Sequence, residues 1–299
     1  MARRTPPQIH GLAVVDKPAG VTSHDVVAML RRRFNERQVG HAGTLDPDAT
    51  GLLLIGVGKG TKLLRFLTAL GKTYEGEVVF GSTTDTLDSA GRVTGTYEMP
   101  NLTVPAARTV AAAQLTGPIM QVPPMVSALK VAGRRLHELA REGIEVERQP
   151  RPVTVHSFTV DPTDNPAVMR IEVRCSAGTY IRTLADDLGR LLGGGAHLRN
   201  LRRTAVGTFT TADAGSPDDA PLLSLAQSMR DYPSVVVDEA TQALIANGRT
   251  LGRGLMPAAD GPWAVCNGAG DLLAMYESWI EGVVKPAAMV ADAAGHSAG

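Results

Sequence analysis

The residues best able to do chemistry lie together between positions 40 and 51. This stretch has the sequence Gly-His-Ala-Gly-Thr-Leu-Asp-Pro-Asp-Ala-Thr-Gly, and the apolar residues 52–55 follow it directly. A polar loop that leads into a buried strand is a common place for catalytic groups. Asp46 is the candidate reactive carboxylate, because Pro47 restricts the residue before it to extended geometry. The alternative is a structural turn in which these residues only cap and bend the chain.

A second carboxylate and an arginine extend this candidate site. Asp48 follows Asp46 closely, and residue type alone does not choose between them. We expect Thr179 to cap a helix whose first turn contains Arg182, where a cation opposes the helix dipole by some tenths of a kcal/mol. An anion from elsewhere, either Asp46 or a phosphate, would stabilise that cation. The alternative partner is Asp186, four residues further along the same helix.

The surrounding patterns predict the elements that hold these residues. A short strand over 9–15 and a helix capped by Ser23 precede the loop, and a strand over 52–57 follows it. Alternation over 73–80 predicts another strand with Tyr74 on its buried side. On this pattern alone, Tyr74 is most simply an ordinary core tyrosine.

Later segments differ in composition from this core. Residues 121–151 are rich in arginine and glutamate, contain prolines near both ends and have few large apolar side chains. They form either a mobile basic clamp or a solvated surface helix and turn. We expect one domain over 9–230 that includes this insert, a small domain over 235–290, and a frayed tail over 291–299.

Composition excludes several classes of protein. The chain has 299 residues, of which 43% are hydrophobic and 20% charged, as in ordinary globular proteins. No apolar run reaches the roughly 18 residues of a membrane span, and the first residues lack the apolar core of a secretory signal. Cys175 and Cys266 lie far apart without CxxC spacing, which argues against a zinc site or disulfide framework and suits a reducing cytoplasm.

The formal net charge of zero hides an uneven distribution. Residues 130–151 hold six Lys or Arg and four Glu, and residues 197–210 hold three Arg and no acid. Residues 256–299 hold five acids and one Lys. Because the acidic C-terminal part cancels the basic middle, a local basic surface for nucleic acid remains compatible with the neutral total.

Several motifs together resemble one enzyme family. The 40–51 loop is similar to the catalytic motif of the TruB family of pseudouridine synthases, which isomerise uridine 55 in the TΨC arm of tRNA. Five further segments resemble the family's motifs and occur in its order: 16–23, 71–74, 123–130, 143–148 and 175–189. The resemblance extends from residue 11 to about residue 207. Jointly these motifs are far more specific than any one of them.

The resemblance implies an α/β fold of the α+β type, with a mixed, largely antiparallel sheet and a small C-terminal PUA-like β domain. It implies Asp46 as the nucleophile, Tyr74 as the residue that contacts the base, and Arg182 as the partner of Asp46. Arg182 is expected to keep Asp46 ionised and to lower its pKa. The reaction is an isomerisation of a flipped-out base, so it implies no metal, no cofactor and no redox partner.

The resemblance also implies contacts with RNA. His41 resembles the residue that stacks in the gap left by the flipped base, and Lys17, Lys130, Tyr180 and Arg202 are expected to bind RNA or support the site. The implied partner is the T arm of tRNA, bound by a cytoplasmic monomer without any membrane association.

The chain departs from the family pattern at two positions. Val126 stands where an aromatic residue is expected, and Asp48 where the family often has an apolar one. A non-catalytic tRNA-binding or folding protein is the alternative function, although joint retention of Asp46, Tyr74 and Arg182 favours an enzyme. A generic α+β metabolic enzyme would leave the basic insert and the C-terminal unit unexplained.

Overall fold

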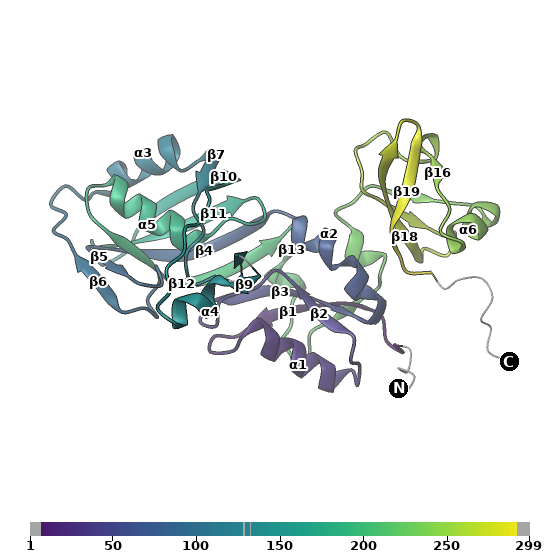
Figure 1. Ribbon diagram of the computed structural model, residues 1–299, viewed down its shortest axis with the longest axis horizontal. Helices are drawn as coiled ribbons and strands as arrows, with labels where there is room; N and C mark the ends of the chain where they lie inside the picture. Colours follow the sequence, from purple (N-terminus) through teal and green to yellow (C-terminus); the bar gives the residue numbers. More distant parts are fainter. Residues whose placement is uncertain (1–6, 128, 132, 292–299) are drawn as a thin grey trace.

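The computed structural model describes residues 7–127, 129–131 and 133–291. Its strands form a ten-stranded sheet and a five-stranded sheet, with two small two-stranded ribbons beside them (Figure 1). The ten-stranded sheet contains β1 (Gly11–Lys17), β2 (Val39–Ala42), β3 (Thr50–Val57), β4 (Lys72–Phe80), β7 (Gly117–Gln121), β10 (Arg151–Pro162), β11 (Val168–Cys175), β12 (Ala196–Val206), β13 (Phe209–Thr210) and β14 (Leu222–Leu223). The helices beside it are α1 (Ser23–Arg33), α2 (Leu64–Ala69), α3 (Val104–Gln114) and α5 (Ile181–Leu191).

The predicted mixed, largely antiparallel sheet is confirmed. Its main path runs β14-β1-β3-β12-β4-β11-β10-β7, while β2 pairs with β3 and β13 with β12. The only parallel pairing recorded in this sheet joins β12 to β3. The late strand β12 therefore lies between two early strands, and it brings distant parts of the sequence to the centre of the sheet.

Both faces of the central strands are buried. On β1, Ala13 and Val15 pack into a core with α1, α3 and α5, while Leu12 and Val14 pack into a second core with α2 and the C-terminal domain. Successive side chains of a strand point to opposite faces. This double burial explains why the apolar run over 52–55 in β3 is continuous rather than alternating.

The start of α1 corrects one expected cap. Thr22, not Ser23, is the N-cap: its hydroxyl accepts from the Asp25 backbone N–H, and the Asp25 carboxylate accepts from the Thr22 N–H. This reciprocal arrangement is a capping box. It leaves the buried Ser23 side chain available for the loop that carries Asp46.

The segment after β3 is a 3₁₀ turn (Gly58–Leu63) followed by the short helix α2. The polar connection over 82–101 contains a ribbon of β5 (Ser82–Thr84) and β6 (Val93–Thr96), whose loop reaches the site described below.

The basic insert is a small ribbon and a short helix. β8 (Lys130–Val131) pairs with β9 (Arg134–Arg135), and α4 (Leu136–Arg141) follows. Among the side chains of the insert that the structure describes, those of Pro123, Pro124, Leu136 and Leu139 are buried.

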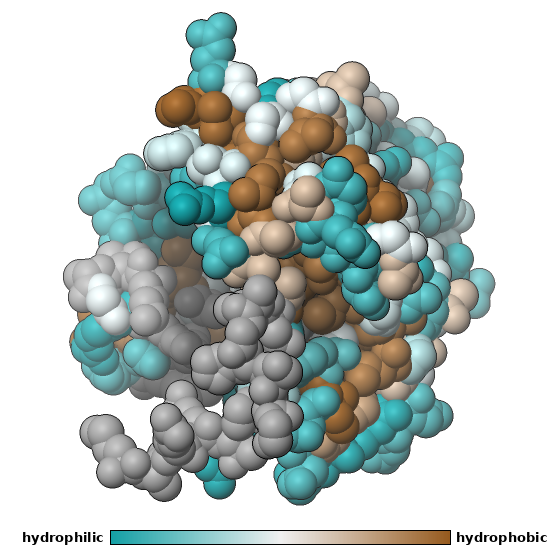
Figure 2. Space-filling view, turned by 90° about the vertical axis from the view of Figure 1, so that its right-hand side faces the viewer, coloured by the Kyte–Doolittle hydropathy of each residue, from teal (hydrophilic) through white to brown (hydrophobic). Residues whose placement is uncertain are grey.

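The C-terminal domain contains the five-stranded sheet and one helix. Its elements are β15 (Ser234–Val236), α6 (Glu239–Ala246), β16 (Leu251–Gly252), β17 (Trp263–Cys266), β18 (Leu272–Ile280) and β19 (Val283–Met289). It contacts the first sheet through α2: Arg65 pairs with Glu277 at 3.1 Å, and the Tyr232 hydroxyl donates to the Phe66 carbonyl. Figure 2 views the molecule from this side, where apolar side chains reach the surface; those of Val236, Leu244, Leu255 and Ile280 are exposed.

The expected tail over 291–299 lies outside the described residues except for Ala291, which packs against the C-terminal core. Among the helices of residues 7–291 that the structure describes, none has the length and apolar character needed to cross a membrane.

Candidate active site

Asp46 lies in the short loop between β2 and β3, and two buried polar side chains hold this loop in place. The Lys17 ammonium, with no exposed surface, donates to the carbonyls of Pro18, Val21 and Pro47 at 2.7 to 2.9 Å. Burial lowers the pKa of Lys17 to about 8, while neighbouring carboxylates act in the opposite direction. The Lys17 ammonium therefore supports the site by binding the loop from inside the protein.

Ser23 makes the second attachment. Its hydroxyl accepts a hydrogen bond from the Leu45 N–H at 2.9 Å and donates to the Leu45 carbonyl at 3.2 Å. The residue directly before Asp46 is thus fixed to the first turn of α1. Together, Lys17 and Ser23 restrain the backbone on both sides of the carboxylate.

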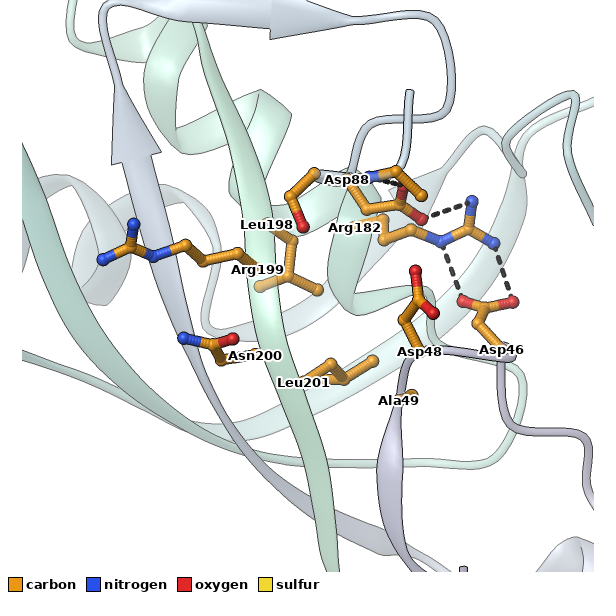
Figure 3. Close-up of a pocket in the computed structure, with 11 residues that line it drawn as sticks. Asp46, Asp48, Ala49, Asp88, Arg182, Leu198, Arg199, Asn200 and Leu201 are labelled. Carbon is orange, nitrogen blue, oxygen red and sulfur yellow. Dashed lines mark hydrogen bonds and ion pairs between the residues drawn. The ribbon is translucent and has the colours of Figure 1, made fainter. Parts of the chain in front are cut away.

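Arg182 pairs directly with Asp46, which decides between its two expected anions. The Arg182 Nε lies 3.0 Å from Asp46 Oδ2, and its Nη2 lies 3.3 Å from Asp46 Oδ1. Figure 3 shows Asp46 and Asp88 on two sides of the Arg182 guanidinium, with Asp88 Oδ2 3.5 Å from Nη1. Arg182 also donates to the carbonyls of Thr86 and Val126 at 2.8 Å. The two-point contact between Arg182 and Asp46 fixes the relative orientation of the guanidinium and the carboxylate.

The helix that carries Arg182 differs in detail from the expectation. Tyr180, not Thr179, is the N-cap of α5, and the Thr179 hydroxyl donates to the Ser176 carbonyl instead. The alternative pair with Asp186 is not formed, because Asp186 accepts from Arg190. Arg182 does lie in the first turn, as predicted, and its charge is compensated by carboxylates from other elements.

The pKa of Asp46 shifts in the direction opposite to our expectation. Burial raises it, and this effect outweighs the lowering caused by Arg182; Asp88 and Asp48 raise it further. The Asp46 side chain is 40% exposed, and it lines the small cavity beside the ion pair. Desolvation of a charged group in such a place favours its neutral form. The arginine is therefore the main influence that keeps this carboxyl ionised.

A cavity of about 40 Å³ opens beside the ion pair. It is lined by Asp46, Asp48, Ala49, Asp88, Ser89, Ala90, Arg182, Leu198, Arg199, Asn200 and Leu201. Ordinary ligand sites have roughly 300 to 1,000 Å³, so this cavity is small for a ligand site. A wider cavity of about 590 Å³ lies beside the insert, between residues that include Gln121, Arg151 and Tyr180.

Tyr74 lies on β4 and is 8% exposed. Its pKa is raised, first by burial; Asp46 contributes in the same direction, whereas Arg203 close to the hydroxyl lowers it. Tyr74 is therefore both a core residue and a neighbour of the site. At neutral pH its side chain is a neutral phenol.

His41 lies on β2, and its ring meets the exposed His24 ring edge-on, with 5.2 Å between centroids. Burial, His24 and Arg203 lower the pKa of His41 to about 4, so the ring is neutral at pH 7. Its buried Nδ1 has no hydrogen-bond partner among the described residues.

The other expected RNA-binding residues are spread more widely. Tyr180 lines the wider cavity, where its backbone pairs with the Gln121 side chain through two hydrogen bonds. Arg202 is bound by Asp16 through two contacts of 2.6 and 3.0 Å, so its guanidinium already has a partner. Lys130 lies in β8, and its side chain is outside the described part of the structure.

Sequence reasoning missed two residues that the structure brings to the site, Asp88 and Arg203. It also missed that Ser23 holds the loop that carries Asp46. Asp88 lies in a Gly- and Thr-rich connection without a periodic pattern. Arg203 was counted only within a basic stretch, yet it is 1% exposed. Periodicity gave no signal for its burial, because β12 contains two register shifts and its buried positions, 196, 198, 203 and 206, do not alternate.

These features define an enzyme-like site in an α+β protein: a clamped aspartate with an arginine partner at a small cavity, beside a buried tyrosine. Among the described residues, no cluster of His, Cys, Asp or Glu is arranged to hold a metal ion. The site can present an oriented carboxylate to an electron-poor atom.

The comparisons with known proteins identify the family. Residues 31–181 match the model of the TruB family pseudouridylate synthase N-terminal domain, and residues 182–221 match that of the tRNA pseudouridylate synthase B C-terminal domain. The chain is similar to the tRNA pseudouridine synthase B of Corynebacterium aurimucosum, with 46% identity over 89% of this chain and 92% of the relative. It is 43% identical to that of Mycobacterium bovis, over 93% of this chain and 97% of the relative.

The fold has a solved counterpart. A chain in the crystal structure of a Cbf5-Nop10-Gar1 complex matches with a TM-score of 0.68 and 23% identity, over 91% of this chain and 79% of the other. The protein belongs to the TruB family of pseudouridylate synthases. The small cavity at Asp46 is thus the candidate active site of an isomerase.

Proposed function

We propose that the protein converts uridine 55 in the T arm of tRNA to pseudouridine, with Asp46 as the nucleophile and without a cofactor. The observation that carries this proposal is the two-point contact of Arg182 with Asp46 at the cavity, in a chain of this family. The relatives of about 45% identity are named as synthases that act on tRNA.

The reaction places clear demands on the site. The N1–C1′ bond of the target uridine breaks, the uracil turns, and a C5–C1′ bond forms, while the C5 hydrogen leaves as a proton and N1 gains one. The ionised Asp46 carboxylate supplies the electron pair for the covalent step, and Arg182 holds that carboxylate charged and oriented. Every non-hydrogen atom of the base is retained and one proton is lost for one gained, so no oxidant or reductant is needed.

Tyr74 packs beside the base in this proposal. Its neutral phenol offers an apolar face to the uracil and a hydroxyl to the proton that leaves C5. Because burial keeps that hydroxyl protonated, it would accept the C5 proton only while passing its own proton on. This makes Tyr74 a relay rather than a permanently ionised base.

The residues that line the small cavity belong to segments 46–49, 88–90, 182 and 198–201. The basic insert contacts the ion pair beside this cavity, because the Val126 carbonyl at the start of the insert accepts a hydrogen bond from Arg182. We propose that the insert opens to admit the flipped base, with the neutral His41 ring stacking in the RNA and Lys130 and Tyr180 contacting the RNA from the side of the insert.

The proposed organisation extends to the whole chain. We propose a catalytic domain over 9–230 and a PUA-like RNA-binding domain over 235–290, the second supported by its separate five-stranded sheet. A monomer in the cytoplasm is proposed, and the two buried free thiols, Cys175 and Cys266, support a reducing compartment.

The test compares wild type with Asp46→Asn and the matched control Asp48→Asn. The substrate is an unmodified tRNA transcript with tritium at uracil C5, so tritium release reports C5–H cleavage; a transcript with cytidine at position 55 is the substrate control. We expect release by wild type and Asp48→Asn, none by Asp46→Asn, and equal tRNA binding by all three.

Two outcomes would contradict the proposal. Turnover by Asp46→Asn together with its loss in Asp48→Asn would identify Asp48 as the nucleophile. Binding of tRNA by wild type without tritium release would favour the alternative, a non-catalytic tRNA-binding or folding protein.

A further inference from the structure

Arg203 is a buried cation without a carboxylate partner. Its side chain is on β12 and is 1% exposed, and none of the ion pairs found among the described residues includes it. The neighbouring titratable groups that it influences are Lys17, Lys72, His41 and Tyr74, and none of these carries a negative charge at neutral pH. Burying an unpaired charge lowers the stability of the folded state, so packing alone does not account for an arginine at this position.

The contacts of Arg203 reach both ends of the loop that carries Asp46. Its Nε donates to the Leu52 carbonyl at 2.7 Å, just after the loop, and its Nη2 donates to the Gly43 carbonyl at 3.2 Å, just before it. One guanidinium therefore bridges the two ends of the loop. The planar fork of arginine suits this, since its donors have fixed relative directions.

Two glycines of the loop sequence lie close to Arg203. Gly51 has φ +100°, and a Cβ there would lie 2.2 Å from the Arg203 carbonyl oxygen. Gly43 has φ +87°, and a Cβ there would lie 3.6 Å from Arg203 Nη1. Both positions favour glycine because of their backbone conformation. At Gly51 the absence of a side chain also lets the loop approach the arginine's own backbone.

The same guanidinium lies close to the Tyr74 hydroxyl, and the two residues are direct partners across β12 and β4. Arg203 also pairs with Gly51 in the parallel ladder of β12 and β3. It therefore contacts the strand that carries the tyrosine and the loop that carries the aspartate, and Leu45 and Ala49 of that loop pack in the same core as Tyr74.

We propose that Arg203 is a positioning residue that sets the distance and orientation between Asp46 and Tyr74 by tying both ends of the 43–52 loop to the tyrosine. The predicted effect on catalysis rests on the proposed function, whereas the restraint of the loop by Arg203 is independent of it. Arg203 acts through other groups and does not touch the base. A reaction that needs nucleophile and tyrosine on one uracil is sensitive to such a restraint, because a displacement of about 1 Å can cost about 100-fold in rate.

The experiment uses Arg203→Met, which keeps the length and apolar stem, and Arg203→Lys, which keeps the charge but loses the fork. The matched control is Arg108→Met: Arg108 also donates its Nε to a backbone carbonyl at 2.7 Å, that of Val160, far along the sheet from the site. Three quantities are measured on each full-length protein: the single-turnover rate constant, the tRNA dissociation constant, and the hydrogen exchange of backbone amides.

For Arg203→Met we expect a single-turnover rate about 10- to 100-fold lower, a tRNA dissociation constant within about twofold of wild type, and faster exchange confined to residues 43–52 and β4. Arg203→Lys should recover part of the rate, because an ammonium can reach one of the two carbonyls. Arg108→Met should change neither the rate nor the exchange of the loop.

Either of two results for Arg203→Met would overturn the proposal. In the first, hydrogen exchange becomes faster evenly over the whole chain while the single-turnover rate per folded molecule stays normal. In the second, the fall in the single-turnover rate is fully accounted for by weaker binding of tRNA. If Arg203→Met does not fold, Arg203→Lys decides by the same criteria. A wild-type protein that makes no pseudouridine would refute the proposed function, whereas the exchange data would still test the restraint by Arg203.

Discussion

Replacing Arg182 by Met should shift the pH dependence of the reaction as well as slow it. The guanidinium makes two contacts with Asp46, one with Asp88 and two with backbone carbonyls, and its side chain is 5% exposed. Removing one partner of a buried ion pair typically costs about 3 to 5 kcal/mol, because the remaining charge is left uncompensated. Arg182→Met should therefore lower the free energy of unfolding by an amount in this range.

The shift in pH follows from the same contacts. An opposite charge at this distance typically lowers a carboxyl pKa by about 1 to 3 units. The pKa of Asp46 is already raised by burial, so loss of Arg182 should raise it further by a similar amount. In the proposed reaction Asp46 acts in its ionised form. The acid limb of the rate profile should thus move to higher pH by about 1 to 3 units.

Asp88→Asn provides a control of opposite sign. Asp88 raises the pKa of Asp46, so its neutralisation should move the acid limb to lower pH while Arg182 stays bound to Asp46. The assay is the single-turnover rate between about pH 5 and pH 9, with urea unfolding of each variant to verify that it is folded. An acid limb that stays in place in Arg182→Met, or that moves in the same direction in both variants, would refute the electrostatic reasoning.

Three further predictions concern the scaffold. Burial lowers the pKa of Lys72 to about 8, so between pH 8 and 10.5 the unfolded chain binds more protons than the folded protein. As pH rises through this window, the unfolding free energy of wild type should increase by up to about 3 kcal/mol relative to that of Lys72→Met. Urea unfolding at a series of pH values measures this difference. Ser23→Ala should lower the unfolding free energy by about 1 to 3 kcal/mol and slow the reaction, because the Leu45 N–H loses its buried acceptor; an unchanged turnover rate would argue against the attachment. Gly51→Ala should abolish folding or activity, because its Cβ would overlap a backbone oxygen. Gly178 also has a positive φ, +85°, but has open space around it, so Gly178→Ala should lower the free energy of unfolding by only about 1 to 2 kcal/mol, measured by thermal unfolding.

Local sequence patterns predicted the helices and strands of this protein better than they predicted the contacts between them. The strand with Tyr74 on its buried side and the helix with Arg182 in its first turn follow from periodicity, and both are present. The pairing of Arg182 with Asp46 was one of two open alternatives. The structure decides it, because only the folded chain shows that a carboxylate from another element occupies that position.

Other features had no local signal. Asp88 reaches Arg182 from a ribbon whose sequence is polar and irregular, so its contact depends entirely on how distant segments meet. The caps of both helices were predicted one residue away from their true positions, which is a small error in sequence but frees Ser23 for a different task. The direction of the Asp46 pKa shift was wrong because burial is not visible in a sequence.

The position of β12 between β3 and β4 sets the order of events during synthesis of the chain. Asp46 directly precedes β3 and Tyr74 lies on β4, two strands that are separated by β12 in the main path of the sheet. At a translation rate of about 5 to 20 residues per second, β12 is synthesised on the order of 10 s after β4. Until then the edges of β3 and β4 that pair with β12 lack their partner, and unpaired strand edges are prone to pair with other chains. The sheet that joins the two residues can therefore be completed only after residue 206 has been synthesised.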